Sequence, residues 1–108
     1  MATVKKLDGS SRSIREWQSI VTEWAVSKGF DWTKDDVDTM LIRIHSEVSE
    51  ASEAIRDEDF KGFAEELSDI FIRLVNVCQV WGIDLEKGVI EKHNKNVDRP
   101  QLHGRKRK

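Results

Sequence analysis

The chain has 108 residues, which is enough for one domain with a modest hydrophobic core. Charged side chains make up 35% of it and proline occurs once, a composition that favours helices. The net charge is −2, and four of the 18 basic residues are the last four, so the 20 acidic side chains dominate elsewhere. An acidic body argues against a nucleic-acid-binding surface across the fold. The single cysteine, Cys78, excludes an intrachain disulfide framework.

Neither end of the sequence carries a strong targeting signal. The N-terminus lacks an apolar signal region and no run approaches membrane-spanning length, so we expect a cytoplasmic protein that binds no membrane. The terminal Arg105-Lys106-Arg107-Lys108 could indicate nuclear import or nucleic-acid binding, but four basic residues after a glycine are weak evidence for either. We therefore predict a flexible basic tail over residues 100–108.

Apolar residues at positions i, i+3, i+4 and i+7 predict a first helix over residues 13–28. The polar residues 1–12 before it are expected to form a flexible lead-in. Ser11 or Ser13 is a suitable N-cap for this helix, and Gly29 is a suitable C-terminal stop.

Two longer helices are predicted next, over residues 34–56 and 60–81. Thr33 followed by Asp36 resembles a capping box with Asp in place of Glu, and Gly82 ends the second of these helices. Their apolar stripes are expected to form the core: Val37, Met40, Leu41, Ile44, Val48, Ala51 and Ile55 on one, and Phe60, Phe63, Leu67, Ile70, Phe71, Leu74, Cys78 and Trp81 on the other.

A fourth helix is predicted over residues 85–96, with Asp84 as its N-cap and Pro100 ending regular structure. The sequence contains no repeat, no second domain and no convincing strand alternation. These observations predict an all-α fold, a single-domain four-helix bundle over residues 13–99. Because the chain is short and several helices have wide apolar stripes, we expect it to assemble as a dimer or tetramer.

Two acidic pairs lie on the predicted second and third helices. Glu47 and Glu50 are three residues apart, as are Glu66 and Asp69, and this spacing is close to one helical turn. Both pairs flank their apolar stripe on the same rotational side. Antiparallel packing of the stripes could therefore bring four carboxylates together, where they would repel one another and resist desolvation. A hard cation with oxygen ligands, Mg²⁺ or Mn²⁺, would remove that penalty.

The alternative interpretation of an acid pair at this spacing is a solvated helix face. Glu53, Glu58 and Glu65 lie further from the stripes and serve as examples of such surface charges. Two pairs on consecutive helices, both beside the core stripe, favour the metal site over this alternative.

The segments around the acids resemble a known family. HSEVSEASEAIR is similar to the first metal helix of the MazG-like all-α nucleoside triphosphate pyrophosphohydrolases. FAEELSDIFIRLVNVCQVWGIDLEKGVIEKHNKN is similar to the second metal helix and the helix that follows it. The resemblance covers about residues 14–103, and the four-acid motif together with GIDLEKGVIEKHNKN makes it specific.

The resemblance implies an enzyme that hydrolyses a nucleoside triphosphate between the α and β phosphates, giving a monophosphate and pyrophosphate. It implies a requirement for Mg²⁺, for which Mn²⁺ may substitute, with Glu47, Glu50, Glu66 and Asp69 as metal ligands. One carboxylate that is not fully used as a ligand could accept the proton of the attacking water, and we assign this role to Glu50. The family's single-domain members are dimers or tetramers with active sites near interfaces between chains.

Phosphate oxygens need further donors, which the resemblance places near the end of the last helix. Lys92, Asn96 and Arg99 are our candidates, although cations there could equally offset the helix dipole. His93, Asn94 and Lys95 in the same segment, and Lys61 before the second acid pair, remain alternatives. The glycines are scattered, so the sequence contains no phosphate-binding P-loop.

The nucleobase needs an apolar or aromatic surface. Trp32 lies between two predicted helices and is our first candidate for base stacking. Trp17 and Trp24 lie in the first apolar stripe and are better explained by core packing, as is Trp81. His45 precedes the first acid and could contact substrate or metal, although a lone histidine is more often structural.

We therefore predict a Mg²⁺-dependent nucleotide pyrophosphohydrolase that acts on a canonical or damaged (d)NTP in nucleotide-pool housekeeping. The closest enzymatic alternative is a phosphoribosyl-ATP pyrophosphohydrolase, which uses a similar acid layout. The alternative from another class is a non-catalytic helical interaction protein whose acids are a solvated face. The expected partners are the nucleotide and further copies of the chain, and no nucleic acid.

Overall fold

The computed structural model of the protein describes residues 4–100, and this part of the chain is helical without strands. The predicted all-α class is therefore confirmed. The helices follow one another as α1 (Ile14–Ser27), a single 3-10 turn η1 (Lys34–Asp36), α2 (Val37–Arg56), α3 (Phe60–Val80) and α4 (Leu85–Asp98). The predicted segments 1–3 and 101–108 lie outside the described residues.

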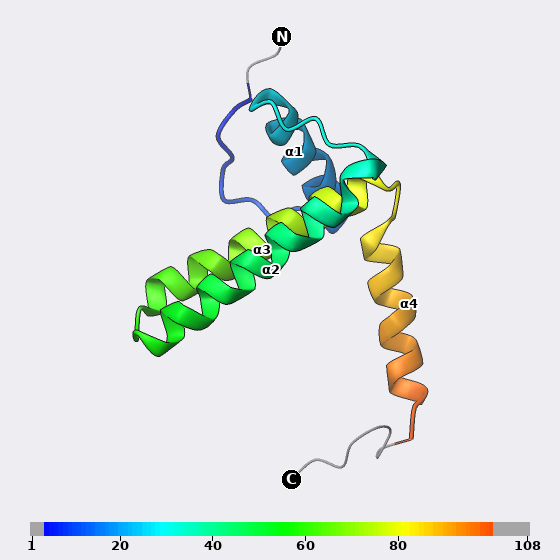
Figure 1. The fold of residues 1–108 in the computed structure, drawn as a ribbon. Coiled ribbons are helices and arrows are strands. Elements are labelled where there is room, and N and C mark those ends of the chain that lie inside the picture. Colours follow the sequence, from blue (N-terminus) through cyan, green and yellow to red (C-terminus); the bar gives the residue numbers. More distant parts are fainter. Residues whose placement is uncertain (1–3, 101–108) are drawn as a thin grey trace.

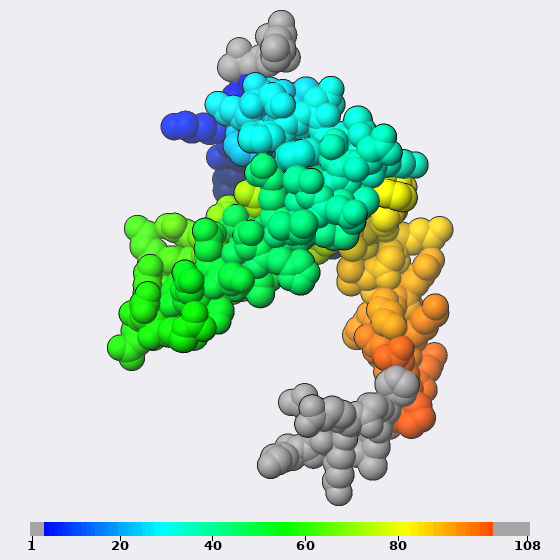
Figure 2. Space-filling model, in the orientation of Figure 1, coloured from blue at the N-terminus to red at the C-terminus, as the bar shows by residue number. Residues whose placement is uncertain are grey.

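Helices α2 and α3 form a long antiparallel hairpin, and α1 packs against α3 at the end away from the hairpin turn (Figure 1). Helix α4 leaves this three-helix core and projects beside it as a separate arm (Figures 1 and 2). No residue of α4 is buried. The four predicted helices are thus present, but they do not close into one bundle, because α4 packs on the rest only near its first turn.

The ends of α1 follow the predicted signals. Ser13 and Glu16 form a reciprocal capping box, in which the Ser13 Oγ accepts the Glu16 N–H at 3.1 Å and the Glu16 Oε1 accepts the Ser13 N–H at 2.9 Å. Gly29 follows the helix with φ of 90°, a left-handed conformation that a side chain would disfavour. The N–H of Phe30 then bonds the carbonyl of Ala25, which completes the C-terminal cap.

The hairpin begins and turns with similar local chemistry. Asp36 accepts the N–H of Thr33 at 2.8 Å, so this pair stabilises η1 and leads the chain into α2. After α2, Glu58 takes a positive φ of 56°, and Asp59 caps α3 by accepting the N–H of Gly62 at 2.9 Å. Gly82, with φ of 68°, ends α3 as predicted. The turn between α2 and α3 is therefore short enough to hold the two helices side by side.

The buried core is small. Its apolar members come from three helices: Val21 and Ala25 from α1, Met40 and Ala51 from α2, and Val75 and Cys78 from α3. Much of the predicted stripe is instead more than a third exposed, namely Leu41, Val48, Ile55, Phe60, Leu67, Leu74 and Trp81. The prediction that Trp24 packs in the core is also wrong, since 44% of this residue is exposed. Three helices leave one side of a hairpin uncovered, which explains the difference.

A polar junction holds the start of α4 on α1. Gln18, only 4% exposed, donates to the Gln79 side chain at 3.2 Å and to the Ile83 carbonyl at 2.8 Å, and it accepts the Leu85 N–H at 3.1 Å. Arg15 pairs at 2.7 Å with Asp84, which is also the N-cap of α4, and at 2.7 Å with Glu86. The direction of α4 is thus set by hydrogen bonds and ion pairs within its first turn.

Candidate metal centre

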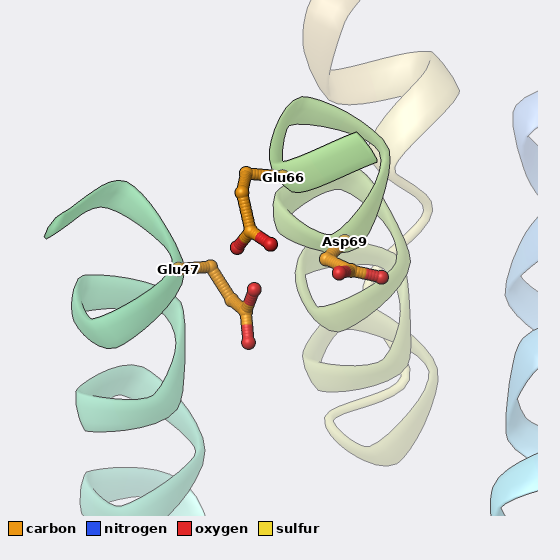
Figure 3. Close-up of side chains that lie close together, drawn as sticks. All are labelled: Glu47, Glu66 and Asp69. Atoms are coloured by element: carbon orange, nitrogen blue, oxygen red, sulfur yellow. The ribbon is translucent and has the colours of Figure 1, made fainter. Parts of the chain in front are cut away.

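Carboxylates from α2 and α3 meet in the middle of the hairpin. Glu47 projects from α2 toward Glu66 of α3, and Asp69 lies beside them on α3 (Figure 3). One carboxylate oxygen from each lies within 4.8 Å of the others. Antiparallel packing brings them together because each helix carries its acids beside the stripe that faces its neighbour.

Two of these carboxylates are only partly satisfied. Glu47 is 9% exposed, and its Oε2 is buried without a hydrogen-bond partner among the described residues. The Oε2 of Glu66 is likewise buried without a hydrogen-bond partner among the described residues. A buried charged oxygen without a partner is costly, and each such group calls for a ligand or a proton. A set of oxygen donors of this kind fits a hard divalent cation such as Mg²⁺ or Mn²⁺.

The same crowding affects protonation. A proton on Glu66 would be shared in hydrogen bonds with Glu47 and Glu50, and this effect, together with burial and the negative charges of its neighbours, raises the pKa of Glu66 to about 8. A proton therefore takes the place of a cation on Glu66 at neutral pH when no metal is bound. This pKa is a property of the metal-free site, since a bound cation would reverse its main causes.

Glu50 lies at the edge of the cluster rather than at its centre. It is close enough to interact with Glu66, but its side chain is exposed and it is not among the three acids whose oxygens converge. The structure thus brings together three of the four predicted ligands most closely and leaves Glu50 more accessible to water.

Arg73 is a member of this site that the sequence analysis did not single out. It lies one turn after Asp69 on α3, and its Nε is 3.3 Å from the Oε1 of Glu47. The signal was present in the sequence, because a residue four positions after an acid on a helix shares its face. The partner of Arg73 lies on another helix, however, so only the packing of α2 on α3 reveals the pair.

The predicted phosphate-binding residues are not placed beside these acids. Lys92 and Asn96 lie on α4 and Arg99 directly follows it, on the arm that separates from the hairpin (Figure 1). Each of the three is exposed. Within one chain, the structure therefore does not unite these residues with the carboxylate cluster.

Trp32, the predicted base-stacking residue, belongs to an aromatic group ahead of α2. Its ring stacks on Phe30 with centroids 5.6 Å apart and an interplanar angle of 17°. The Arg43 guanidinium lies over both rings, 5.3 Å from the Trp32 centroid and 5.7 Å from the Phe30 centroid. Arg43 is one turn before Glu47, so α2 connects this aromatic group to the acids.

The other aromatic candidate borders a cavity. Trp17 meets Phe71 edge to face, with centroids 6.4 Å apart, and both line a cavity of about 470 Å³ between α1 and α3. Leu67, Ser68 and Ile72 complete its lining.

Two further residues considered in the sequence analysis belong neither to the three-acid cluster nor to the lining of this cavity. Trp81, predicted to be core, is 39% exposed, and the Lys34 ammonium lies 5.3 Å from its ring centroid. His45 is exposed on α2.

The fold and this cluster define an all-α protein with a carboxylate site between two antiparallel helices. A family model described as the MazG nucleotide pyrophosphohydrolase domain matches residues 35–103, more than half of the chain. The chain belongs to this family, which confirms the predicted resemblance. The match begins within η1, two residues before α2, and does not include α1. No curated protein and no solved structure is significantly similar to the chain.

The MazG domain is a nucleotide pyrophosphohydrolase domain, and divalent metals are used in this family. The helices of the described part of the chain are too short or too polar for a membrane span.

Proposed function

We propose that the protein is a Mg²⁺-dependent hydrolase that cleaves a (d)NTP between its α and β phosphates, giving a (d)NMP and pyrophosphate. The enzyme would act in the cytoplasm, where it would remove normal or damaged nucleotides from the nucleotide pool. The observation that carries it is the convergence of Glu47, Glu66 and Asp69 from two helices of a MazG domain, with buried and unpartnered oxygens on two of them.

Glu47, Glu66 and Asp69 are the proposed metal ligands, and Glu50 completes the set. A bound Mg²⁺ or Mn²⁺ would supply charge neutralisation and Lewis acidity at the phosphates. The carboxylates alone would repel a triphosphate, so this cluster suits the substrate only together with cations.

Glu50 is the proposed general base. Its carboxylate is exposed, unlike that of Glu47, and it lies beside the converging acids. A water molecule at the edge of the cluster could therefore transfer its proton to Glu50 as it attacks the phosphorus atom. The geometry supports this choice because the more buried acids are better placed to serve as ligands.

A second copy of the chain is part of the proposal. The carboxylates lie on the hairpin, whereas Lys92, Asn96 and Arg99 are carried by the projecting arm. The apolar residues Val89 and Ile90 on that arm are about half exposed, as is much of the hairpin stripe. We propose that α4 packs on the hairpin of another copy in a dimer or tetramer, and so brings its phosphate-binding residues to the acids of that copy.

Trp32 is the proposed stacking surface for the nucleobase. Phe30 and Arg43 hold its ring in a defined orientation before the substrate arrives. A pre-oriented indole would lower the conformational cost of binding the base.

Two alternative functions would make different use of the same acids. A phosphoribosyl-ATP pyrophosphohydrolase would use the same acids on another nucleotide. A non-catalytic helical protein would leave the acids solvated, but the unpartnered buried oxygens of Glu47 and Glu66 do not favour a merely solvated face.

A product screen tests the reaction. The purified protein is incubated with the common NTPs and dNTPs and with dUTP, in Mg²⁺ or in EDTA, and the products are separated by chromatography. The proposal expects monophosphate and pyrophosphate from a subset of substrates, abolished by EDTA and by Glu47→Gln. Diphosphate and orthophosphate would contradict the site of cleavage, and turnover of phosphoribosyl-ATP alone would support the enzymatic alternative.

A further inference from the structure

Arg73 is the cation that the structure places in direct contact with the candidate metal ligands. Among the described residues, it alone forms an ion pair with one of the three acids, and its Nε lies 3.3 Å from the Oε1 of Glu47. It projects from α3 one turn after Asp69, on the side that faces α2. Arg73 therefore belongs to the surface that a ligand of the cluster would meet.

The ion pair with Glu47 uses little of the capacity of this side chain. Within residues 4–100, Arg73 donates a side-chain hydrogen bond only from its Nε, and the side chain is 36% exposed. Its two terminal nitrogens donate no hydrogen bond to any other residue of the described part of the chain. The pair also leaves the Oε2 of Glu47 buried and without a partner within residues 4–100, so Arg73 does not by itself satisfy this carboxylate. A guanidinium with free terminal N–H groups is well suited to phosphate oxygens, which it can bind with two parallel hydrogen bonds.

We propose that Arg73 is a substrate-binding residue that contacts the phosphate groups released as pyrophosphate. The inference rests on the proposed function, because it places those phosphates at the cluster of Glu47, Glu66 and Asp69. Arg73 pairs with Glu47 while the cluster holds no cation, and it turns its terminal nitrogens to phosphate oxygens when cation and substrate are present. The proposal differs from the assignments on α4 because Arg73 comes from the hairpin itself.

The positions of these charges predict two effects of opposite sign. Arg73 competes with a divalent cation for Glu47 and repels it, so its charge weakens the binding of Mg²⁺ alone. The same charge attracts pyrophosphate and donates hydrogen bonds to it. A residue that only stabilised the hairpin would change the binding of both ligands in the same direction.

Calorimetric titration separates these roles. Mg²⁺ alone, and then pyrophosphate in saturating Mg²⁺, are titrated into the wild type and into Arg73→Met, which keeps much of the apolar stem. We expect Arg73→Met to bind Mg²⁺ as tightly as the wild type or a few-fold more tightly, and to bind pyrophosphate about tenfold to a hundredfold more weakly. Arg73→Lys, which keeps the charge without the fork, should give an intermediate loss for pyrophosphate.

Arg56→Met is the matched control, because Arg56 lies near the turn of the same hairpin and donates its side-chain hydrogen bond to Ser52, away from the acids. It should leave both affinities unchanged. Circular dichroism checks that each variant is folded. If Arg73→Met does not fold, Arg73→Lys carries the test, with unchanged Mg²⁺ binding and weaker pyrophosphate binding as the expected result.

The proposal is overturned if a folded Arg73 variant binds pyrophosphate like the wild type, or loses both ligands together. Such a result leaves the proposed function standing when the wild type binds Mg²⁺ and Glu47→Gln abolishes that binding. If the wild type binds neither Mg²⁺ nor pyrophosphate, the proposed function fails and this assignment of Arg73 fails with it.

Discussion

Glu47 on α2 and Glu66 on α3 face each other across the hairpin, and each buries its Oε2 without a partner among the described residues. Their helices are joined by a short turn, so the two carboxylates cannot move apart without separating helices that share the core of the protein. The repulsion between them can be relieved by a proton or by a cation.

Magnesium should stabilise the folded protein. A cation that binds only the folded state adds about 2.7 kcal/mol to the free energy of unfolding at 100 times its Kd. We expect the Tm to rise with Mg²⁺ in thermal unfolding followed by circular dichroism, and Glu47→Gln or Glu50→Ala to lose most of that rise. Glu53→Gln, an exposed acid on the same helix, is the control and should keep it. Equal stabilisation of Glu47→Gln and the wild type would count against the metal site.

The stability of the metal-free protein should depend on pH through Glu66. Its folded pKa of about 8 lies above its ordinary value of 4.5, so the folded state binds the proton more tightly than the unfolded state. The contribution of this group to stability is therefore fully present below pH 4.5 and is lost as the pH rises through about 8.

Urea unfolding in EDTA across this pH range measures the effect. We expect the free energy of unfolding to fall more steeply with pH for the wild type than for Glu66→Gln, which cannot ionise. Mg²⁺ should displace the proton from Glu66, so titrations in buffers of different ionisation enthalpy should reveal proton release near neutral pH. A wild type and a Glu66→Gln variant with the same pH profile would contradict the raised pKa.

Gln18 should be a stability determinant of the junction between α1 and α4. Gln18→Leu leaves the N–H of Leu85 and the carbonyl of Ile83 without the bonds they now make. We expect a loss of about 1–3 kcal/mol in the free energy of unfolding by urea. Ser19→Ala, on an exposed position next to it, should change stability by less than about 0.5 kcal/mol. A neutral Gln18→Leu would show that the buried amide is not needed to hold α4.

Assembly and turnover should depend on the apolar side of α4. The chain has a mass of 12.5 kDa, and light scattering should return a multiple of this value. Ile90→Lys should shift the protein toward the monomer and reduce turnover, because a charge on a buried interface is costly.

Glu91→Lys is the matched control, since it introduces the same side chain at a neighbouring exposed position. A wild-type protein that remains monomeric and fully active would disprove both the assembly and the shared site.

The local signals in the sequence were sufficient for the helices. Ser13, Gly29, Gly82 and Asp84 act at the helix ends where they were predicted, because caps and stops depend on hydrogen bonds within a few residues. Small differences remain where local bonding is ambiguous. The second helix begins with a 3-10 turn before Val37, since Asp36 bonds back to Thr33.

The candidate site was predictable in part for the same reason. Acid pairs one turn apart beside an apolar stripe predicted a cluster of Glu47, Glu50, Glu66 and Asp69. Three of these acids, all but Glu50, bring carboxylate oxygens close together, because the side of a helix that packs on its neighbour follows from its periodicity. The α4 residues were proposed from the resemblance and Trp32 from its position between two predicted helices, and their roles remain predictions. The exposure of Trp24 and Trp81 was missed, because a stripe shows which side is apolar and not whether another helix covers it.

By itself, then, the sequence determined the helices, their caps and the side of each helix on which the acids lie. These properties arise from hydrogen bonds and periodicity within about one or two turns. Only the tertiary structure decided that Arg73 meets Glu47, that Glu50 lies at the edge of the cluster, and that α4 projects from the core. Each of these depends on the distance and rotation between helices, which the packing of side chains far apart in the chain sets and which no local pattern encodes.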